Sequence, residues 1–339
     1  MSMRKILIFF LFLTFTFSAH SQVGGESVYQ FLNLVSSPRH AALGGKTIAM
    51  YDYDVNQPLF NPATINEEMN KRLAVNYASY FADINYGTAS YVHTFKKLKP
   101  IHFGVNYINY GTFDGRDELG NQTGSFSGSE TAISLGYAYT IPNTKVHIGA
   151  SAKMISSKLE SYSSFGLASD IGLLAVSKSG NVNYALVLRN IGTQLSTYNG
   201  LQEKLPFEVL VGISQELEKV PVRWNLTLEN LQKWDVAFSN PARTQQTIDG
   251  NVEEEKITFL DNAFRRVIFG AEIMPKKAFN IRLSYNFRRS AELKLVEQRS
   301  FAGLSLGFGL RFNKFRFDYA YSRYTLAGST SLFGVMINL

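Results

Sequence analysis

Hydrophobic and polar residues alternate one by one along most of the chain after residue 71. In the stretch "AFNIRLSYNFRRS", the apolar residues Phe279, Ile281 and Leu283 alternate with the polar residues Arg282 and Ser284. Side chains two positions apart on a β-strand point to the same face. Each such segment therefore has one apolar face and one face of polar or small residues, and the pattern predicts β-strands.

The length of these segments separates two kinds of β-protein. A soluble β-sandwich also alternates, because it buries one face of each strand. Its strands usually have about 5–6 residues, whereas the segments here run for about 10–14, which is long enough to cross a bilayer when tilted. Length therefore favours a membrane barrel over a sandwich.

The number and the connections of the segments agree with a barrel. Fourteen are predicted, an even number as in single-chain bacterial barrels, at 72–82, 83–95, 100–111, 130–141, 144–158, 165–178, 181–192, 205–218, 221–233, 263–275, 278–290, 300–313, 314–323 and 330–339. Short turns follow the even segments, and longer loops follow most odd ones, at 112–129, 159–164, 193–204, 234–262, 291–299 and 325–329. The join near Asp83 is tight and is the exception. Short periplasmic turns and long external loops are typical of outer-membrane barrels. We therefore predict an all-β fold, a transmembrane outer-membrane β-barrel of about 14 antiparallel strands.

The segment before the first strand has neither a helical nor a strand period. The stretch "DVNQPLFNPATIN", Asp54–Asn66, contains Pro58 and Pro62, which remove two backbone donors and exclude a central strand or a helix interior. Fourteen strands enclose more space than side chains fill, since barrels of about 8 strands are already just filled. Irregular backbone is tolerated at membrane depth only inside protein or beside water. Residues 22–70 are therefore predicted to form a plug, or hatch, inside a barrel of residues 71–339.

The first residues and the composition indicate an exported protein. Residues 1–21 have the pattern of a Sec signal peptide, with Arg4 and Lys5 before the apolar run "ILIFFLFLTFTF" and a cleavage site that ends at Ser21. The chain has no cysteine, which excludes a disulfide framework, a thiolate metal site and a lipidated cysteine. An exported chain of this kind fits the outer membrane of a Gram-negative cell. The net charge is +7, but the basic residues are scattered, so nucleic-acid binding is not indicated.

Residues that carry catalytic chemistry are few. His102 and His147 lie beside Gly104 and Gly149 in predicted strands, which is consistent with positions that face the lumen. No histidine pair has the spacing of a helical zinc site, and neither an HExxH nor a GxSxG motif is present. We therefore expect no catalytic residue, no cofactor and no metal.

Charged residues on the predicted lumen faces allow two interpretations. The arginines there are Arg223, Arg282, Arg288 and Arg311. They could line a polar pathway, or they could fill the lumen in pairs with Glu208, Glu229 and Glu272. Ionisable residues at membrane depth usually pair with one another, so charge-paired filling is favoured.

The longest predicted loop, 234–262, is a candidate site for a protein partner. It carries the aromatic residues Trp234, Phe238 and Phe259 among polar residues. Connections longer than about 12–15 residues are usually functional or disordered, and aromatic anchors within a polar rim suit protein recognition. The alternative is a solvated loop that only covers the pore.

The stretch "SPRHAALGGKTIAMYDYDVNQPLFNPATIN", Ser37–Asn66, resembles the opening of FadL-superfamily barrels. Three features carry the resemblance: a glycine-rich turn, an acidic stretch and an Asn-Pro-Ala signature, here Gly44 with Gly45, Asp52 with Asp54, and Asn61, Pro62 and Ala63. The family fold is a fourteen-stranded outer-membrane barrel with an N-terminal hatch. Together with "GGESVYQFLNL", Gly24–Leu34, the stretch is similar to the PorQ family of barrels in the type IX secretion system.

That resemblance implies a non-enzymatic part of a cell-surface attachment complex. In it, such barrels hold a PorZ-like surface protein beside a PorU-like transpeptidase and a PorV-like barrel, and secreted proteins are joined to lipopolysaccharide. The superfamily also contains transporters of hydrophobic small molecules. A FadL-like transporter is therefore the alternative, and it would need an apolar lumen pocket and a lateral opening.

Overall fold

The computed structural model describes residues 27–80, 84–96, 98–237, 245–246, 252–253, 257–293, 301–324 and 328–339. The predicted signal peptide, Phe238 and most of the loop 234–262 lie outside these residues. Within the described ranges, no helix is long and apolar enough to cross a membrane.

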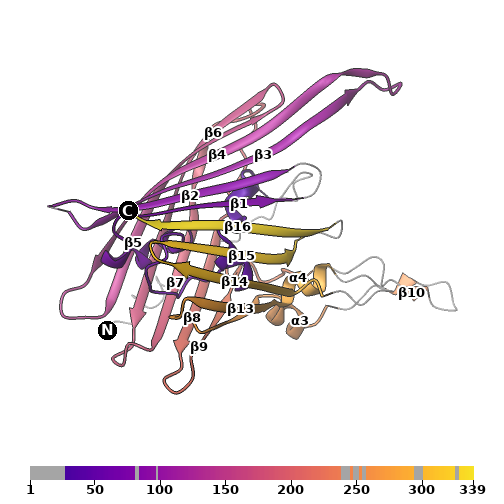
Figure 1. Cartoon of the computed structure of the whole chain (residues 1–339). Helices are drawn as coiled ribbons and strands as arrows, with labels where there is room; N and C mark the ends of the chain where they lie inside the picture. The colour runs from indigo at the N-terminus through magenta and orange to yellow at the C-terminus, as the bar shows by residue number, and fades with distance from the viewer. Residues whose placement is uncertain are drawn as a thin grey trace, which may run out of the picture.

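Fourteen antiparallel strands pair edge to edge and close into one barrel (Figure 1). The strands are β1 (Arg72–Ser79), β2 (Asn85–Thr94), β3 (Pro100–Arg116), β4 (Gln122–Thr140), β5 (Val146–Leu159), β6 (Tyr162–Val176), β7 (Val182–Ser196), β8 (Glu208–Glu216), β9 (Val222–Leu228), β12 (Val267–Ile273), β13 (Phe279–Asn286), β14 (Leu304–Phe312), β15 (Phe315–Arg323) and β16 (Ser329–Asn338). The first and last strands close the barrel, with Val75 opposite Val335. A separate pair, β10 (Gln245–Gln246) and β11 (Val252–Glu253), lies in the long connection after β9. The predicted closed barrel of 14 strands is confirmed.

The alternation along each strand separates an outer from an inner face. On β13, Ile281 and Leu283 are 39% and 37% exposed, whereas Arg282 and Ser284 are 0% and 1% exposed. Large apolar side chains remain exposed in the same way on most strands of the barrel. A continuous apolar outer surface is unfavourable in water and is what a lipid-facing belt requires. The polar residues of the inner face, such as Arg282 and Ser284, are buried.

The two ends of the barrel differ. The turns at the end that carries the C-terminus are short, and Asn313 between β14 and β15 takes the left-handed φ of 52° that a tight hairpin turn favours. This end is assigned to the periplasm, and the opposite end, with the longer connections, is external.

Several predicted boundaries at the external end are wrong, and two of them change the shape of that end. The predicted loop 112–129 is mostly strand, because β3 and β4 stay hydrogen-bonded to each other as far as Arg116 opposite Gln122. Pairing of two strands satisfies their backbone groups without an apolar face, so it continues beyond the point where the hydrophobic alternation stops. The predicted strand 278–290 ends at Asn286, where helix α4 (Phe287–Glu292) begins because the Asn286 side chain accepts a hydrogen bond from Arg289 N. Helix α3 (Phe259–Phe264) similarly precedes β12.

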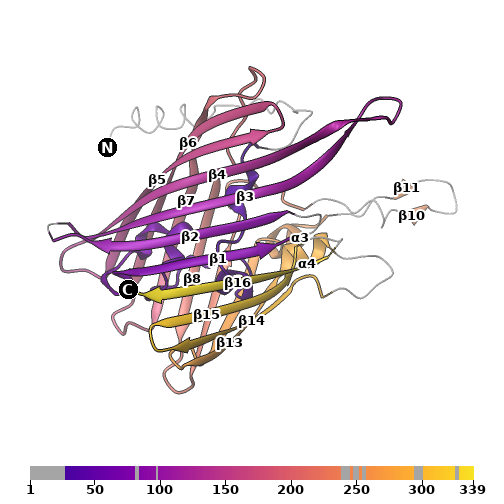
Figure 2. The same cartoon turned by 45° about the horizontal axis from the view of Figure 1, so that its top comes forward.

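Residues 27–70, the N-terminal segment, lie against the inner face of the barrel (Figure 2). The segment contains only short helices, η1 (Gln30–Asn33), α2 (Pro38–Ala42), η2 (Gln57–Leu59), η3 (Pro62–Thr64) and η4 (Glu67–Met69). Helix α2 packs on β13, β14, β15 and β16, and η3 packs on β4, β5 and β6. The short elements are what the two prolines predict, and the segment contacts opposite walls of the lumen.

Candidate functional site

The Asn-Pro-Ala signature packs against two glycines of the barrel wall. Asn61 caps η3, since its Oδ1 accepts a hydrogen bond from Ala63 N at 2.9 Å. A Cβ atom on Gly149 of β5 would overlap the peptide between Pro62 and Ala63. One on Gly172 of β6 would overlap the Asn61 side chain. Glycine at both wall positions therefore lets the signature approach the sheet backbone closely.

The predicted glycine pair ends helix α2. Gly44 and Gly45 have φ of 99° and 117°, in the left-handed region that favours glycine. Gly45 N donates to His40 O at 2.8 Å, which satisfies one of the last carbonyls of the helix. A Cβ atom on Gly44 would overlap Ile268 of β12. This turn therefore places the chain directly on the wall.

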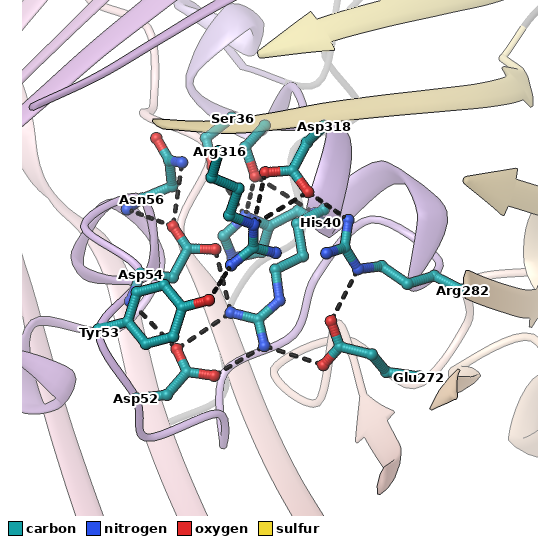
Figure 3. A network of polar contacts seen from close by, with 12 residues as sticks. Ser36, His40, Asp52, Tyr53, Asp54, Asn56, Glu272, Arg282, Arg316 and Asp318 are labelled. Atoms are coloured by element: carbon teal, nitrogen blue, oxygen red, sulfur yellow. Dashed lines mark hydrogen bonds and ion pairs between the residues drawn. The ribbon is translucent and has the colours of Figure 1, made fainter. Parts of the chain in front are cut away.

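A buried ion-pair network fixes α2 to the barrel (Figure 3). Arg39 pairs with Asp52 at 2.7 Å and Asp54 at 3.1 Å, both in the N-terminal segment, and with Glu272 of β12 at 3.0 Å. The Arg39 side chain is 2% exposed, so water and salt screen these pairs little. Burial acts to raise the pKa of Asp52, but Arg39 and then Arg223 outweigh it and hold that pKa below its usual value. Arg39 likewise outweighs the effect of burial on Asp54 and lowers its pKa, so Asp52 and Asp54 are both ionised around neutral pH.

Glu272 extends the network along the barrel wall. It accepts hydrogen bonds from Arg223 at 2.5 Å and from Arg282 at 2.8 Å. Arg282 also contacts Asp318 at 2.6 Å, and Asp318 pairs with Arg316 at 2.9 Å. The network holds four cations and four anions, Arg39, Arg223, Arg282 and Arg316 with Asp52, Asp54, Glu272 and Asp318. Its charges balance.

A second ion-pair network, with two cations and two anions, lies beside the turn formed by Gly44 and Gly45. Lys46 contacts Glu208 at 2.5 Å and Glu229 at 2.9 Å, and Arg189 lies 3.4 Å from Glu208. Arg189 also donates to Leu32 O at 2.9 Å. The contacts connect the N-terminal segment to β7 and β8.

Sequence reasoning missed both Arg39 and Lys46. Their signal was present, since a charge in a segment predicted to be buried requires a partner.

These contacts support charge-paired filling of the lumen, with two corrections. Arg223 and Arg282 pair with Glu272 as that interpretation predicts. Arg288 does not face the lumen from a strand. It lies on α4 and pairs with Glu292 at 2.6 Å. Arg311 is exposed at the periplasmic end of β14.

The two histidines predicted to face the lumen, His102 and His147, are both buried, but they do not contact each other. His102 and His147 are 1% and 8% exposed, and His147 lies 4.6 Å from the Tyr51 ring, between ring centroids. His40 is fully buried in α2 and lies 2.7 Å from Ser37 Oγ through its Nδ1 atom. Among the described residues, no group of three His, Cys, Asp or Glu residues could hold a metal ion.

The described aromatic residues of the predicted partner loop lie at its base. The Trp234 and Phe259 rings are 4.8 Å apart, and the Arg266 guanidinium lies 5.0 Å from the Trp234 ring. Trp234 and Phe259 remain 50% and 68% exposed. They form an exposed aromatic pair next to α3, and Phe238 lies outside the described residues.

The β3–β4 hairpin forms a ribbon at the external end. The last pair between β2 and β3 is Asn85 with Asn109, and the first between β4 and β5 is Gly128 with Leu159. Residues 110–127, which we call the external ribbon, therefore have strand-register partners only among themselves in the described part of the chain, although at the base of the ribbon Ser127 O accepts a hydrogen bond from Glu160 N at 2.9 Å. Figure 2 shows the ribbon projecting past the ends of β1 and β2.

Comparison with known proteins relates the chain to other barrels through its fold. No protein-family model matches the sequence, and no curated protein matches it. A Pseudomonas aeruginosa FadL homologue of known crystal structure is similar with a TM-score of 0.51 and 10% identity, over 93% of this chain and 100% of that chain. Matches to the Acinetobacter baumannii outer membrane protein Omp33 and to the KdgM porin have TM-scores of 0.38 and 0.34, at 8% identity, and cover 79% of this chain and 97% and 99% of those chains. The chain thus has the fold of a FadL-like outer-membrane β-barrel.

Proposed function

We propose that this chain is a non-enzymatic anchor in the outer membrane, and that its external ribbon holds a surface protein. The resemblance of residues 24–66 to PorQ-family barrels suggests the complex. The partner would be a PorZ-like protein, held near a PorU-like transpeptidase and a PorV-like barrel in the attachment complex of the type IX secretion system. Lipid or lipopolysaccharide of the outer membrane would surround the barrel. The external ribbon is the observation that carries the proposal.

The chemistry of the ribbon suits binding of another chain. Beyond Ser127, whose carbonyl accepts from Glu160 N, both edges carry backbone N–H and C=O groups that no neighbouring strand occupies among the described residues. Such edges can pair with a strand of a partner. The Phe113 and Phe126 rings stack with centroids 5.4 Å apart and are 41% and 40% exposed, and Leu119 at the tip is 87% exposed. These side chains supply apolar anchors beside the strand edge.

A lumen plug formed by the N-terminal segment is part of the proposal. The buried ion pairs of Arg39 and Lys46 support it, because a segment that only passed through the lumen would not need them. A chain that lacks residues 27–66 should still assemble and should conduct more ions in planar bilayers. Equal conductance of the shortened and parental chains would remove the support for a plug.

A FadL-like transporter of hydrophobic molecules is the second candidate. It is favoured by the FadL-like fold and by a buried apolar cluster between η1 and the wall. That cluster includes Phe31, Leu32, Tyr86, Ile108 and Ile155. A transporter should take up a hydrophobic probe into cells that express it, and should do so whether or not the external ribbon is intact.

The external ribbon can be tested by shortening it in register. Thr112 and Ser127 are paired, so residues 113–126 can be replaced by an Asn-Gly turn without changing the strands below. The barrel should reach the membrane at the parental level, and the surface partner should be released into the medium. Pull-down of a tagged chain from native membranes identifies that partner.

The matched control replaces residues 241–256 by a Gly-Ser link. That replacement removes most of the predicted partner loop but leaves the exposed pair of Trp234 and Phe259. If the loop variant releases the partner and the ribbon variant keeps it, the loop and not the ribbon is the docking surface. If both keep it at the parental level, the anchoring function is wrong.

A further inference from the structure

Arg289 is a buried cation that has no acidic partner in the part of the chain that the structure describes. Its side chain is 8% exposed, and its Nη2 atom donates to Ser305 Oγ at 2.8 Å. Its guanidinium lies 4.8 Å from the centroid of the Tyr324 ring. Among the described residues, Nε and Nη1 have no hydrogen-bond partner. A buried guanidinium normally has a carboxylate or several acceptors, because its transfer out of water is costly.

The other buried cations of the lumen show what is missing at Arg289. The Arg39 network holds four cations and four anions, and the Lys46 network pairs Lys46 and Arg189 with Glu208 and Glu229. Arg288, the neighbour of Arg289 on α4, pairs with Glu292. Arg289 therefore differs from the charges around it, and a ligand with a negative charge would restore the balance.

A pocket lies next to this cation. It has a volume of about 260 Å³, and its polar lining comprises Asn33, Lys46, Tyr80, Glu229, Asn286, Arg289 and Tyr324. The one carboxylate of this lining, Glu229, is already paired with Lys46 at 2.9 Å. The Tyr80 and Tyr324 rings lie 6.1 Å apart, and both hydroxyls are buried without a partner among the described residues. Tyr80 follows β1, Arg289 lies on α4 and Tyr324 follows β15, so the donors come from three elements at the external end.

We propose that this pocket, the Arg289 pocket, binds a phosphate group. Two guanidinium N–H groups and two phenolic hydroxyls approach from different elements, which suits the oxygens of a tetrahedral anion. The volume admits one such group. The group can belong to inorganic phosphate or to the phosphorylated headgroup of a membrane lipid. The site is independent of the partner that the external ribbon is proposed to hold.

The test uses the full chain refolded in nanodiscs. In zwitterionic nanodiscs, inorganic phosphate should bind saturably in equilibrium dialysis. Arg289→Gln should weaken this binding by about tenfold or more, since a charge-assisted contact is lost. Arg288→Gln is the matched control and should bind as the parent does, because Arg288 is one residue away and does not line the pocket. Heat-modified gel mobility verifies that each barrel is folded.

Two further measurements distinguish the phosphate source and keep the test decisive. Native mass spectrometry compares how well the barrel retains phosphatidic acid and diacylglycerol. If the parent retains phosphatidic acid and Arg289→Gln does not, a lipid headgroup is the source of the phosphate. The double variant Tyr80→Phe with Tyr324→Phe keeps the cation and most of the volume, and should bind severalfold more weakly than the parent. If neither phosphate nor phosphatidic acid binds the parent, or if both sets of variants bind like the parent, the proposal is wrong.

Discussion

Replacement of Glu272 by glutamine tests whether the Arg39 network excludes water and whether its positive and negative charges compensate one another, as its geometry indicates. Glu272 is 1% exposed and contacts Arg39, Arg223 and Arg282 at 3.0, 2.5 and 2.8 Å. Glutamine preserves the shape but removes the charge, so four arginines then face three carboxylates. Removal of one partner from a buried pair costs about 3–5 kcal/mol, because it leaves an uncompensated buried charge.

The control for this change is an exposed pair in the same protein. Glu292 pairs with Arg288 at 2.6 Å on α4, and their side chains are 37% and 33% exposed. An exposed pair at this helical spacing contributes about 0.3–0.5 kcal/mol. The expected difference between Glu272→Gln and Glu292→Gln is therefore several kcal/mol.

Urea unfolding of the refolded barrel, followed by tryptophan fluorescence, gives the free energy of unfolding for each variant. A third variant adds Arg223→Leu to Glu272→Gln. It returns the network to three cations and three anions, and should recover part of the lost stability. Equal costs for Glu272→Gln and Glu292→Gln would show that water reaches the network and that the argument from burial is wrong.

Two further predictions concern the N-terminal segment. Gly149→Ala should displace the Asn-Pro-Ala signature, because the new Cβ would overlap the Pro62 peptide, and the displacement should make residues 27–66 more sensitive to protease. Gly87→Ala is the control and should have little effect, because its Cβ would meet its nearest neighbour at 3.4 Å. Burial lowers the pKa of His40 from 6.5 to about 4, so below pH 6.5 the unfolded state takes up a proton that the folded state does not. Stability should therefore fall as the pH drops from about 6.5 towards 4, and His40→Gln should make the fall less steep. An unchanged slope would show that His40 does not contribute to it.

The alternation of side chains made the barrel predictable from the sequence. A period of two, held over membrane-crossing lengths, fixes which residues of β13 face outward, and the count of such runs fixes the number of strands. Pro58 and Pro62 likewise fix the irregular backbone of the N-terminal segment, because a missing N–H and a fixed φ act locally. These features depend on neighbours in the chain, so they needed no tertiary information.

Strand ends and partners depended on the tertiary structure. The external ribbon continues after the apolar alternation stops, because hydrogen bonds between β3 and β4 hold it and the hydrophobic effect does not. Arg39 meets Glu272 across 233 positions of sequence, and Gly172 makes room for Asn61, only when the barrel has closed around the segment. Asn286 begins a helix that turns Arg289 towards the pocket and leaves Arg288 with Glu292. The alternation in the sequence determined which face of each strand is turned to the lumen, but not where each strand ends, as Arg288 and Arg311 show. Barrel closure decided which lumen residues meet, because contacts between distant residues depend on strand register and on the path of the N-terminal segment.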